Sequence, residues 1–484
     1  MIYGDTFPIE TNLNGGSTVT GMKRRALQLV VLCMVIASIA FVASAFLSYE
    51  SAANVAAEQS DVPFSEREQI APPRDNVTVI TGQGFADRDR DALTAFAPDG
   101  RLFYYHDEYN KYQDVDPSPK GRYTVTVVAS QYLTPDECNA AVRKCVEDNI
   151  LRINMSTGET ETLYTIVAPA LYSEKIHDVD RAGPNRFVVA DIIHDRVYML
   201  NTSTGMREWS WQAMTEFSRA NGGEWPNDWT HLNDVEMLPD GRVMASPRNQ
   251  DRVIFIDPET GLQEDWTLGE ENNYSVLYEQ HNPDYIPESQ GGPAVVVADS
   301  HNNRVVEYQR RNGSWEQTWQ WTDERMRWTR DADRLPNGNT LIVDSNGGRV
   351  LEVAPNGSVV WNVTLSSAYD AERIGTGDES AGGESAAKLG LESRGRLDRK
   401  DDSGGDSLIS LIGLKRALFS ALPPKLVSSI LFVTPPWMRV WHVAAIGCSL
   451  LSVVGLVGAE LFWRYQVSFS PREAVSFDGR EADD

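Results

Sequence analysis

Three of the seven histidines in this chain stand at matching points of a pattern that repeats along the sequence. They are His177, His231 and His281, each near the start of one copy. The other polar residues singled out at these starts are Asn233, Asn282 and Arg330. If the copies converge in the fold, the sequence predicts one shared site that holds several imidazoles and a guanidinium group.

Such a set suits a tetrahedral oxyanion, because arginine offers a planar fork of donors to sulfuryl or phosphoryl oxygens. A neutral histidine can also attack such a group and form a covalent intermediate. We add Arg248, because we interpret its turn, SPRNQDR, as one residue longer than its counterparts, with the extra length aiming the side chain inward. An ordinary turn arginine is the alternative. The chain has no G-x-x-x-x-G-K-[ST] loop, so a nucleotide donor held by such a loop is not supported.

Two other interpretations of the three histidines stay open. One is a three-histidine metal site, and the other is a purely structural use of each ring. We expect neither a metal nor a cofactor. His194 and His301 fall in a polar hairpin turn, and we expect both to lie at the surface.

The repeat that must position these residues runs from His177 to Trp361. Its clearer copies contain an acidic D-x-D/E pair, a Gly/Asn turn, a β-branched run, a polar turn that ends in arginine and a second apolar run. The turn arginines are Arg196, Arg252, Arg304 and Arg349, at intervals of 56, 52 and 45 residues by subtraction. A period near 50 with about four short strands is typical of a β-propeller. One blade cannot bury its own faces, so several must close into a ring.

The stretch that begins at Asn76 has the same strand-and-turn character in a more diverged form. We therefore predict an all-β propeller over residues 76–374, with five or six blades and six preferred. The segment NVTVITGQG, which starts at Asn76, could supply the strand that closes the last blade.

The composition excludes some functions. The formal net charge of −25 argues against nucleic acid as a partner. Lysine is scarce, with nine Lys against 35 Arg, and no lysine lies between Lys175 and Lys388. A lysine-poor surface of hydrated carboxylates is typical of proteins from concentrated salt, so we favour a halophilic protein. An ordinary acidic extracellular protein is the alternative.

Two of the four cysteines lie close together outside the apolar runs. Cys138 and Cys145 bracket the segment CNAAVRKC, and we predict a disulfide between them, which requires an oxidising compartment. A metal site is the weaker alternative, because two cysteines lack the four ligands of structural zinc. Cys33 and Cys448 lie within apolar runs.

Two apolar runs, residues 26–47 and 440–463, are long enough to span a membrane as helices. The basic cluster before the first run predicts a cytoplasmic segment 1–25, and the second run then returns residues 464–484 to the cytoplasm. The propeller is thereby expected on the extracellular side of the cell membrane. A cleaved signal peptide is the alternative for the first run, and Met22 is an alternative start to Met1.

The remaining segments connect the spans to the propeller. We expect a polar linker over residues 48–75, a disordered acidic linker over residues 375–407, and an interfacial segment, broken by paired prolines, over residues 408–439. An exported protein can be glycosylated at Asn-x-Ser/Thr, although chance occurrence in Asn-rich turns is the alternative. Such sequons stand at Asn76, Asn154, Asn201, Asn273, Asn312, Asn356 and Asn362.

Several blocks of the sequence resemble the arylsulfotransferase family, and specifically its haloarchaeal membrane-anchored branch. They are WTHLNDVEMLPDGRVMASPRNQDRV, EQHNPDYIP, GGPAVVVADS and RDADRLPNGNTLIVDS. The resemblance covers about residues 76–378 and implies a six-bladed propeller. Bacterial members transfer a sulfuryl group from a phenolic sulfate ester to a phenol through a transiently sulfated histidine, without a nucleotide donor. This chain differs from them in lacking their large N-terminal β-domain and in having two spans.

The resemblance also implies roles for individual residues. The family's His-x-Asn pair matches His231 and Asn233, and an arginine that follows it matches Arg248. Its upstream site histidine matches His177, and its nucleophile matches His281 by blade order. In this interpretation His281 attacks sulfur, while the other two histidines and Arg248 hold the sulfuryl oxygens and the leaving phenolate. Substrate-binding roles are expected for Asn233, Asn282 and Arg330.

The expected function is therefore a membrane-anchored aryl sulfotransferase that uses an aryl sulfate donor and a phenolic or other hydroxyl acceptor. The alternative is a non-enzymatic extracellular propeller that binds a partner or glycan at the cell surface. Convergence of the three histidines on one cavity would favour the enzyme.

Overall fold

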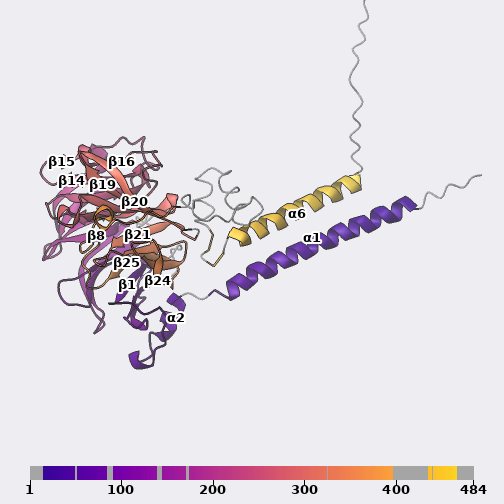
Figure 1. Ribbon diagram of the computed structural model, residues 1–484, viewed down its shortest axis with the longest axis horizontal. Coiled ribbons are helices and arrows are strands. Elements are labelled where there is room, and N and C mark those ends of the chain that lie inside the picture. The colour runs from indigo at the N-terminus through magenta and orange to yellow at the C-terminus, as the bar shows by residue number, and fades with distance from the viewer. Residues whose placement is uncertain are drawn as a thin grey trace, which may run out of the picture. The chain divides into compact units, whose positions relative to one another are not determined.

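Within the residues that the structure describes, the alternating apolar runs form six antiparallel sheets, each one blade of a β-propeller (Figure 1). The structure is a computed structural model and describes residues 15–49, 52–83, 91–138, 144–169, 174–323, 325–395, 434–435, 437–438 and 440–465. The prediction of an all-β, six-bladed propeller is confirmed. Apolar residues on both faces of most strands explain the fold, because each blade is covered by its two neighbours.

The innermost strand of each blade lines the central channel and packs against the innermost strand of the next blade. These strands are β4 (Lys111–Pro117), β8 (Ile176–Gly183), β12 (Leu232–Met237), β17 (His281–Ile286), β21 (Thr329–Arg334) and β25 (Ala368–Arg373). We name each blade by its innermost strand.

The outer strands follow in order away from the channel. The β4 blade adds β5 (Thr124–Leu133), β6 (Cys145–Asn154) and β7 (Glu159–Pro169), and the β8 blade adds β9 (Arg186–Asp191), β10 (Arg196–Asn201) and β11 (Met206–Gln212). The β12 blade adds β13 (Val243–Pro247), β14 (Arg252–Asp257), β15 (Gly261–Leu262) and β16 (Leu268–Gly269). The β17 blade adds β18 (Ala294–Asp299), β19 (Arg304–Arg311) and β20 (Ser314–Trp321), and the β21 blade adds β22 (Thr340–Asp344), β23 (Arg349–Val353) and β24 (Val359–Thr364). The β25 blade adds β1 (Thr78–Gly82), β2 (Leu93–Phe96) and β3 (Leu102–His106).

The β25 blade joins the two ends of the propeller and so closes the ring. Strand β1 lies between β25 and β2, with Thr78 opposite Arg373 and Ile80 opposite Ala371. The expectation that NVTVITGQG supplies a closing strand is therefore correct. An open ring would leave a free strand edge. In the closed ring the backbone groups of that edge are paired.

Short 3-10 helices occupy several of the turns. They are η1 (Phe64–Glu66), η2 (Ala213–Thr215), η3 (Arg248–Gln250), η4 (Glu264–Trp266), η5 (Glu288–Gln290) and η6 (Ser300–Asn302). Two of them, η3 and η6, follow the second strand of adjacent blades and contribute to the site described below.

A residue is inserted near the start of the innermost strands, at nearly the same point in each blade. The register with the second strand shifts between Tyr112 and Asp114, Ile176 and Asp178, Leu232 and Val235, His281 and Pro283, and Thr329 and Asp331. In the β25 blade the shift falls opposite Ala368 to Ala371. Such bulges bend a strand and redirect a side chain, so they decide which residues face the end of the channel.

The segment expected as a polar linker before the propeller is ordered where the structure describes it. Helix α2 (Ala52–Gln59) buries Ala52 and Ala56, and Arg67 donates to the Leu102 carbonyl at 2.8 Å. Gln69 forms a bridge with Arg101 at the edge of the β25 blade.

The first part of the expected disordered linker is also ordered, and for residues 375–395 that prediction is wrong. Ser380 and Ser385 are fully buried, and the short helix α3 (Ala386–Leu389) begins at Ser385, whose hydroxyl accepts from the Lys388 amide. The Ala386 amide donates to both carboxylate oxygens of Glu307 at 2.8 and 3.0 Å. These contacts outweigh the glycine- and serine-rich composition on which the prediction rested. Residues 396–433, which hold the rest of that linker and most of the predicted interfacial segment, lie outside the described residues.

The predicted disulfide is present. Cys138 and Cys145 are bonded, with their Cα atoms 5.8 Å apart. The bond ties the loop after β5 to the first residue of β6.

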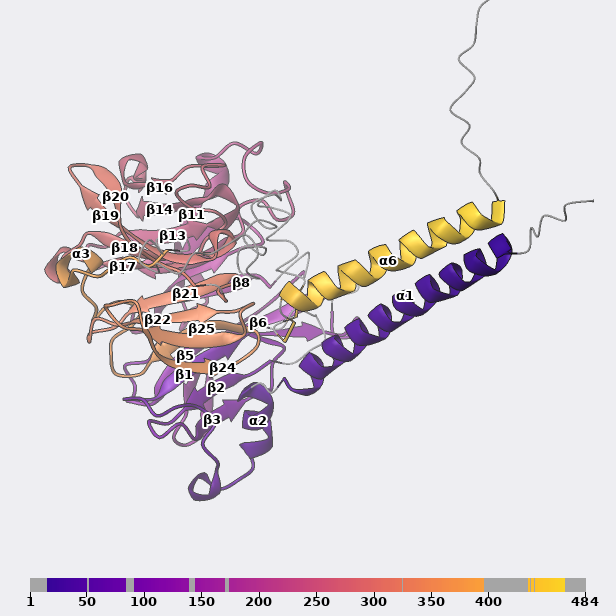
Figure 2. The ribbon, with the colours of Figure 1, turned by 45° about the vertical axis from the view of Figure 1, so that its right-hand side comes forward.

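The terminal helices form a compact unit of their own, α1 (Gly15–Leu47) with α6 (Val440–Tyr465) (Figure 2). They run antiparallel, because Arg24 donates to Glu460 at 2.8 Å near one end and Phe46 contacts Trp437 near the other. Residues 24–47 and 441–463 are long and apolar enough to span a membrane. The ion pair explains how Glu460 is accommodated in an otherwise apolar segment.

Candidate active site

The bulges place six polar side chains at one level of the channel, which we call the mouth ring. Its members are Gln113, His177, Asn233, His281, Arg330 and Tyr369, one from each innermost strand. Five of them directly precede the acidic pair of their strand, as His177 precedes Asp178 and Arg330 precedes Asp331, and His281 precedes Asn282, which takes the first acidic position in β17. The ring therefore occupies equivalent positions in all six blades.

Aromatic contacts connect the predicted histidines to one another. The ring centroids of His231 and His177 are 5.9 Å apart, those of His177 and Tyr369 are 5.3 Å apart, and those of Tyr369 and His281 are 6.2 Å apart. His231 lies in the loop just before β12 rather than on the strand itself. The structure thus brings His177, His231 and His281 together at one end of the channel.

The hydrogen bonding of His281 assigns its tautomer. Its Nδ1 lies 2.7 Å from the Ser300 hydroxyl, and that hydroxyl donates its only proton to a backbone carbonyl, at 2.6 Å for Thr329. The serine oxygen must therefore accept a hydrogen bond from the Nδ1–H group. Nε2 is left with the lone pair that a nucleophile needs.

His231 is held in a similar way by a carboxylate. Its Nδ1 lies 2.5 Å from Asp228 Oδ1, so Nδ1 donates and Nε2 again carries the lone pair. Burial opposes it, but the contact with His231 lowers the pKa of Asp228 to about 2. The carboxylate therefore stays ionised and fixes the imidazole in one orientation.

His177 is almost as deeply buried as His281. Its Nε2 lies 3.5 Å from Glu174, and the Tyr369 hydroxyl lies 3.3 Å from its Nδ1. Glu174 is fully buried and pairs with Lys111 at 3.1 Å. This buried ion pair therefore lies beside His177.

Arg248 reaches the site from η3 and pairs with Glu279. Its Nη2 lies 2.9 Å from Glu279 Oε2, and the same oxygen lies 2.9 Å from His301 Nε2. Although burial opposes it, the hydrogen bond from His301 and the charge of Arg248 hold the pKa of Glu279 far below its ordinary value. Arg248 Nε is buried without a hydrogen-bond partner and remains available to a ligand.

The reason given for Arg248 from the sequence is wrong, although the inward placement is correct. Leu232 pairs with Pro247 as Ile176 pairs with Asp191 in the β8 blade. Four residues then separate Pro247 from Arg252, just as four separate Asp191 from the arginine that it binds. The turn has the same length, and proline replaces the aspartate that holds the turn arginine in other blades.

The surface prediction for His301 is also wrong. Its side chain is only 11% exposed, and its ring lies 4.5 Å from that of Tyr278 and 4.2 Å from that of Trp328. His194, by contrast, is half exposed, as predicted. The two hairpin turns differ because the turn of the β17 blade lies beside Arg248 and Glu279.

Arg330 supplies a second guanidinium group. Its Nη1 donates to Gln83 at 3.1 Å, its Cζ lies 4.8 Å over the Tyr369 ring, and its Nε is buried without a hydrogen-bond partner. Burial lowers the pKa of Arg330 to about 10, so the group is charged at neutral pH. Two arginines therefore offer uncommitted N–H donors near the histidines.

The histidines themselves remain neutral. Burial lowers the pKa of His177 to about 3, and burial together with the charge of Arg248 lowers the pKa of His231. Burial and the charges of Arg248 and Arg330 lower the pKa of His281 well below its ordinary value. The site thus combines neutral imidazoles with positive guanidinium groups, which suits an anionic substrate.

Several residues of the site adopt backbone conformations that are costly for residues other than glycine. The φ angles are 47° at His231, 45° at Glu279, 30° at Asn282 and 53° at Trp328. Left-handed conformations of this kind persist where the surrounding structure over-determines them, often at functional sites. Here they lie in or just before three adjacent innermost strands.

The two predicted asparagines differ in placement. Asn233 belongs to the mouth ring and donates to the Gln280 carbonyl at 3.0 Å. Asn282 lies one position farther along its strand, at the level where other blades carry aspartate. Its side-chain oxygen is buried without a hydrogen-bond partner.

Sequence reasoning missed several residues of this site. They are Gln113, Glu174, Asp228, Glu279, Ser300, His301 and Tyr369. Gln113 and Tyr369 could have been found, because each precedes an acidic pair, in QDVD and YDAE. The others lie in loops whose folding brings them close, and no spacing along the chain indicates this.

The three-histidine metal site gains no support from the geometry. Among the described residues, the side-chain groups close enough to share one metal ion consist of carboxylates. The ring nitrogens of His281 and His231 described above are directed instead toward a hydroxyl and a carboxylate.

Two family models, each described as arylsulfotransferase (ASST), match residues 72–282 and 202–366. Together they cover more than half of the chain and include all the predicted site residues. The chain belongs to the arylsulfotransferase family. A search of curated proteins returned no match.

Solved structures give a more distant likeness. A protein of unknown function from Bacteroides caccae is 12% identical, with 61% of this chain and 97% of that chain covered and a TM-score of 0.42. The periplasmic gluconolactonase of Pseudomonas aeruginosa is 11% identical, with coverages of 62% and 99% and a TM-score of 0.42. Virginiamycin B lyase from Staphylococcus aureus is 13% identical, with coverages of 62% and 86% and a TM-score of 0.37. At these scores the likenesses bear on neither the site nor the activity.

Proposed function

We propose that this arylsulfotransferase transfers a sulfuryl group from a phenolic sulfate ester to a hydroxyl acceptor through a sulfated His281. The observation that carries the proposal is the buried, neutral His281 imidazole, whose Nε2 holds its lone pair beside two guanidinium groups. Family membership supplies the substrate class.

In the first half of the reaction, His281 Nε2 attacks sulfur and forms an N–S bond. The bond between sulfur and the aryl oxygen breaks, and its electron pair leaves with the phenolate. The charges of Arg248 and Arg330 stabilise the sulfuryl oxygens and the departing anion. The buried imidazole and guanidinium groups are already in place, so little reorganisation is needed during the step.

In the second half, the acceptor hydroxyl attacks sulfur and the N–S bond breaks. The pair of electrons returns to His281 Nε2. His231 Nε2 takes the proton of the attacking hydroxyl, because its Nδ1 is committed to Asp228. That proton passes to the released phenolate or to solvent, which restores the starting protonation state.

This assignment changes the role expected for His231. A neutral imidazole whose Nε2 bears a lone pair is a poor donor to a sulfuryl oxygen but a suitable proton acceptor. We therefore assign the holding of the sulfuryl oxygens to Arg248, Arg330 and His177, and general base catalysis to His231.

The activity can be tested with the full chain purified in detergent and a chromogenic aryl sulfate. Release of the phenolate should require a second phenol, and the sulfated second phenol should accumulate in equal amount. Equal release with and without acceptor would indicate a hydrolase. No release with any aryl sulfate, together with tight binding of a glycan or protein, would favour the non-enzymatic alternative.

We also propose that the propeller lies on the extracellular side, with residues 1–25 and 464–484 in the cytoplasm, as in the haloarchaeal membrane-anchored branch. The antiparallel pairing of α1 and α6 supports having both ends on one side. The disulfide supports an oxidising compartment for the propeller. A protease added to intact cells should digest the propeller and spare a C-terminal epitope tag, and protection of the propeller would contradict this orientation.

A further inference from the structure

Below the mouth ring, the channel is lined by carboxylates that the proposed reaction does not use. Each innermost strand carries two of them, separated by one residue, except that Asn282 takes the first place in β17. The set is Asp114, Asp116, Asp178, Asp180, Asp234, Glu236, Asp284, Asp331, Asp333, Asp370 and Glu372. All but Glu236 are at least nine-tenths buried.

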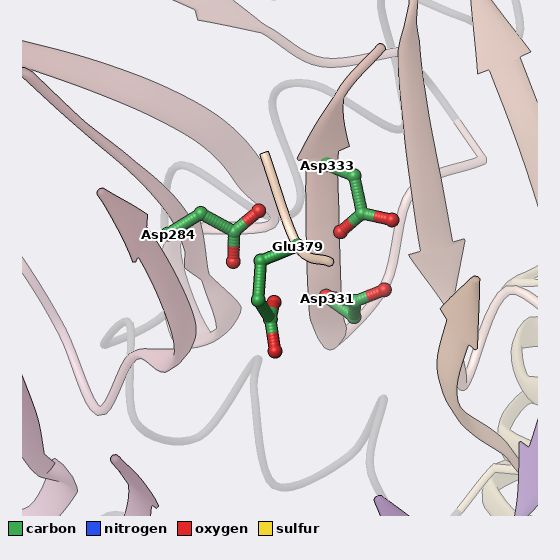
Figure 3. Close-up of side chains that lie close together, drawn as sticks. All are labelled: Asp284, Asp331, Asp333 and Glu379. Atoms are coloured by element: carbon green, nitrogen blue, oxygen red, sulfur yellow. The ribbon is translucent and has the colours of Figure 1, made fainter. Parts of the chain in front are cut away.

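Four carboxylates at one side of this channel come together from three separate segments. Asp284 lies on β17, Asp331 and Asp333 lie on β21, and Glu379 lies in the segment that follows β25. One carboxylate oxygen of each lies within 4.8 Å of the others. Figure 3 shows Glu379 between Asp284 on one side and the two aspartates of β21 on the other.

Protein donors satisfy one oxygen of two of these carboxylates and leave the other without a hydrogen-bond partner. Asp284 Oδ2 accepts from the Ser380 hydroxyl at 2.6 Å, whereas Oδ1 is buried without a hydrogen-bond partner. Asp331 Oδ2 accepts from the Ala371 amide at 3.2 Å, whereas Oδ1 is buried without one. Asp333 Oδ2 is likewise buried without a hydrogen-bond partner. These three aspartates are at most 2% exposed, so they are shielded from bulk solvent.

Other buried carboxylates of this propeller have a different arrangement. Glu307 pairs with Arg334 at 3.0 Å, and Glu352 pairs with Arg373 at 2.9 Å. A buried carboxylate without a cation is strongly unfavourable. Among the described residues, no ion pair joins an arginine or lysine to the four clustered carboxylates, so a bound cation or shared protons must compensate their charge.

We propose that Asp284, Asp331, Asp333 and Glu379 bind one calcium ion. Oxygen-only ligands select hard cations. Calcium accepts six to eight oxygens in irregular geometry, with carboxylates bound through one or both oxygens, whereas magnesium requires near-ideal octahedral geometry and usually keeps several waters. Four buried carboxylates match calcium better.

The ion would tie the C-terminal end of the propeller chain to two neighbouring blades. Its ligands connect the β17 and β21 blades to the segment after β25, which then continues through Ser380 and α3 against Glu307. Calcium would therefore hold residues 375–395 in place and reinforce the closed ring. This role concerns stability and is independent of the proposed sulfotransferase reaction.

The test uses the full chain in detergent, first stripped with a chelator and dialysed, then titrated with calcium chloride. We expect metal analysis to show one strongly bound calcium ion per chain that magnesium at equal concentration does not displace. The midpoint of thermal unfolding should rise by roughly 5 °C or more at a hundredfold excess over the dissociation constant.

Two variants make the test specific. Asp333→Asn and Glu379→Gln should each abolish the bound calcium and the calcium-dependent rise in unfolding temperature. Glu379 lies outside the strands, so its variant keeps the test usable if Asp333→Asn fails to fold. As a matched control, Glu352→Gln removes a buried carboxylate that already has arginine partners, and it should keep the calcium response even if its basal stability falls.

Two outcomes would overturn the proposal. In the first, no calcium binds, and Asp333→Asn raises the unfolding temperature equally with and without calcium. That result would mean that the carboxylates share protons and repel one another. In the second, calcium binds but both variants retain it, which would place the ion elsewhere in the chain.

Discussion

The mouth ring and the acidic rings beneath it lie on the same six strands, one residue apart, yet their chemistry is opposite. His177 is followed by Asp178, and Arg330 by Asp331. The upper level offers neutral imidazoles and guanidinium groups, whereas the lower levels offer carboxylates. Under the proposed function, a sulfate ester is drawn to the end of the channel that carries the guanidinium groups.

The bulges explain how adjacent residues can differ so sharply. Without them, alternation along a strand would direct neighbours such as His281 and Asn282 to opposite faces. The inserted residue changes the direction of the chain at the mouth and leaves the acids below on the channel side. The bulges thus allow one strand to carry both a mouth-ring residue and the acidic residues below it, without a separate domain for either.

The largest expected effect comes from removing the proposed nucleophile. His281→Ala should abolish turnover and also the sulfuryl adduct, because no other group is proposed to bond to sulfur. Mass spectrometry after brief exposure to an aryl sulfate should find an added SO₃ on the His281 peptide of the unmodified protein. An adduct that persists in His281→Ala, or that maps to the His231 peptide, would identify a different nucleophile.

Two control variants test whether the mouth ring acts separately from the acidic levels below it. His194→Ala removes an exposed histidine and should leave the rate unchanged. Asp234→Asn alters the acidic level directly below Asn233 and should change the rate by less than about threefold, since Asp234 is not among the groups proposed to contact the substrate. A loss as large as that of His281→Ala would show that the two levels do not act separately.

A smaller effect is expected for Arg248. Arg248→Ala should lower kcat/KM by roughly 10²–10³-fold, because one donor to the developing charge is lost while Arg330 remains. The adduct should still form, more slowly, since the attacking nitrogen is intact. Single-turnover measurement of adduct formation would check this, and complete loss of the adduct would mean that Arg248 is needed to bind the donor at all.

Ser300 allows a subtler test of the mouth ring. Ser300→Ala removes the acceptor of the hydrogen bond from His281 Nδ1–H, so the imidazole should sample the wrong tautomer. The rate should fall by about tenfold, which corresponds to the free energy of one hydrogen bond. Ser300→Thr keeps the hydroxyl and should recover much of the rate. Equal loss in both variants would point to packing rather than to the hydrogen bond.

The fold was predictable because each blade repeats the same pattern of strands and turns. His177, Asn233, His281 and Arg330 were predictable for the same reason, since their positions recur, whereas His231 lies two residues before the recurring position of its blade. The partners Asp228 and Glu279 were not, because they lie in loops of no regular spacing. The prediction of disorder over residues 375–395 failed for a physical reason. Their glycines and serines permit disorder, but Ser380 and Ala386 form hydrogen bonds with buried partners that the composition does not show.

The smallest expected effect is that of pH on the rate. A histidine with an ordinary pKa near 6.5 would lose about tenfold of its neutral form at pH 5.5. The pKa of His281 lies well below that value because the ring is buried beside Arg248 and Arg330, so kcat/KM should change less than about twofold between pH 7.5 and 5.5.

The same pKa shifts should make the stability of the protein depend on pH, although the rate of the folded protein should not. In the unfolded chain these histidines bind protons below about pH 6.5, whereas in the folded chain His177 does so only near pH 3. The unfolded state thus binds more protons than the folded state in this pH range. The free energy of unfolding should therefore fall as the pH falls from 6.5 toward 3. Initial rates must therefore be taken on protein shown to be folded at each pH. A tenfold fall in kcat/KM with an apparent pKa near 6.5, on folded protein, would mean that the reacting histidine is solvated and that the mouth ring does not hold it as described.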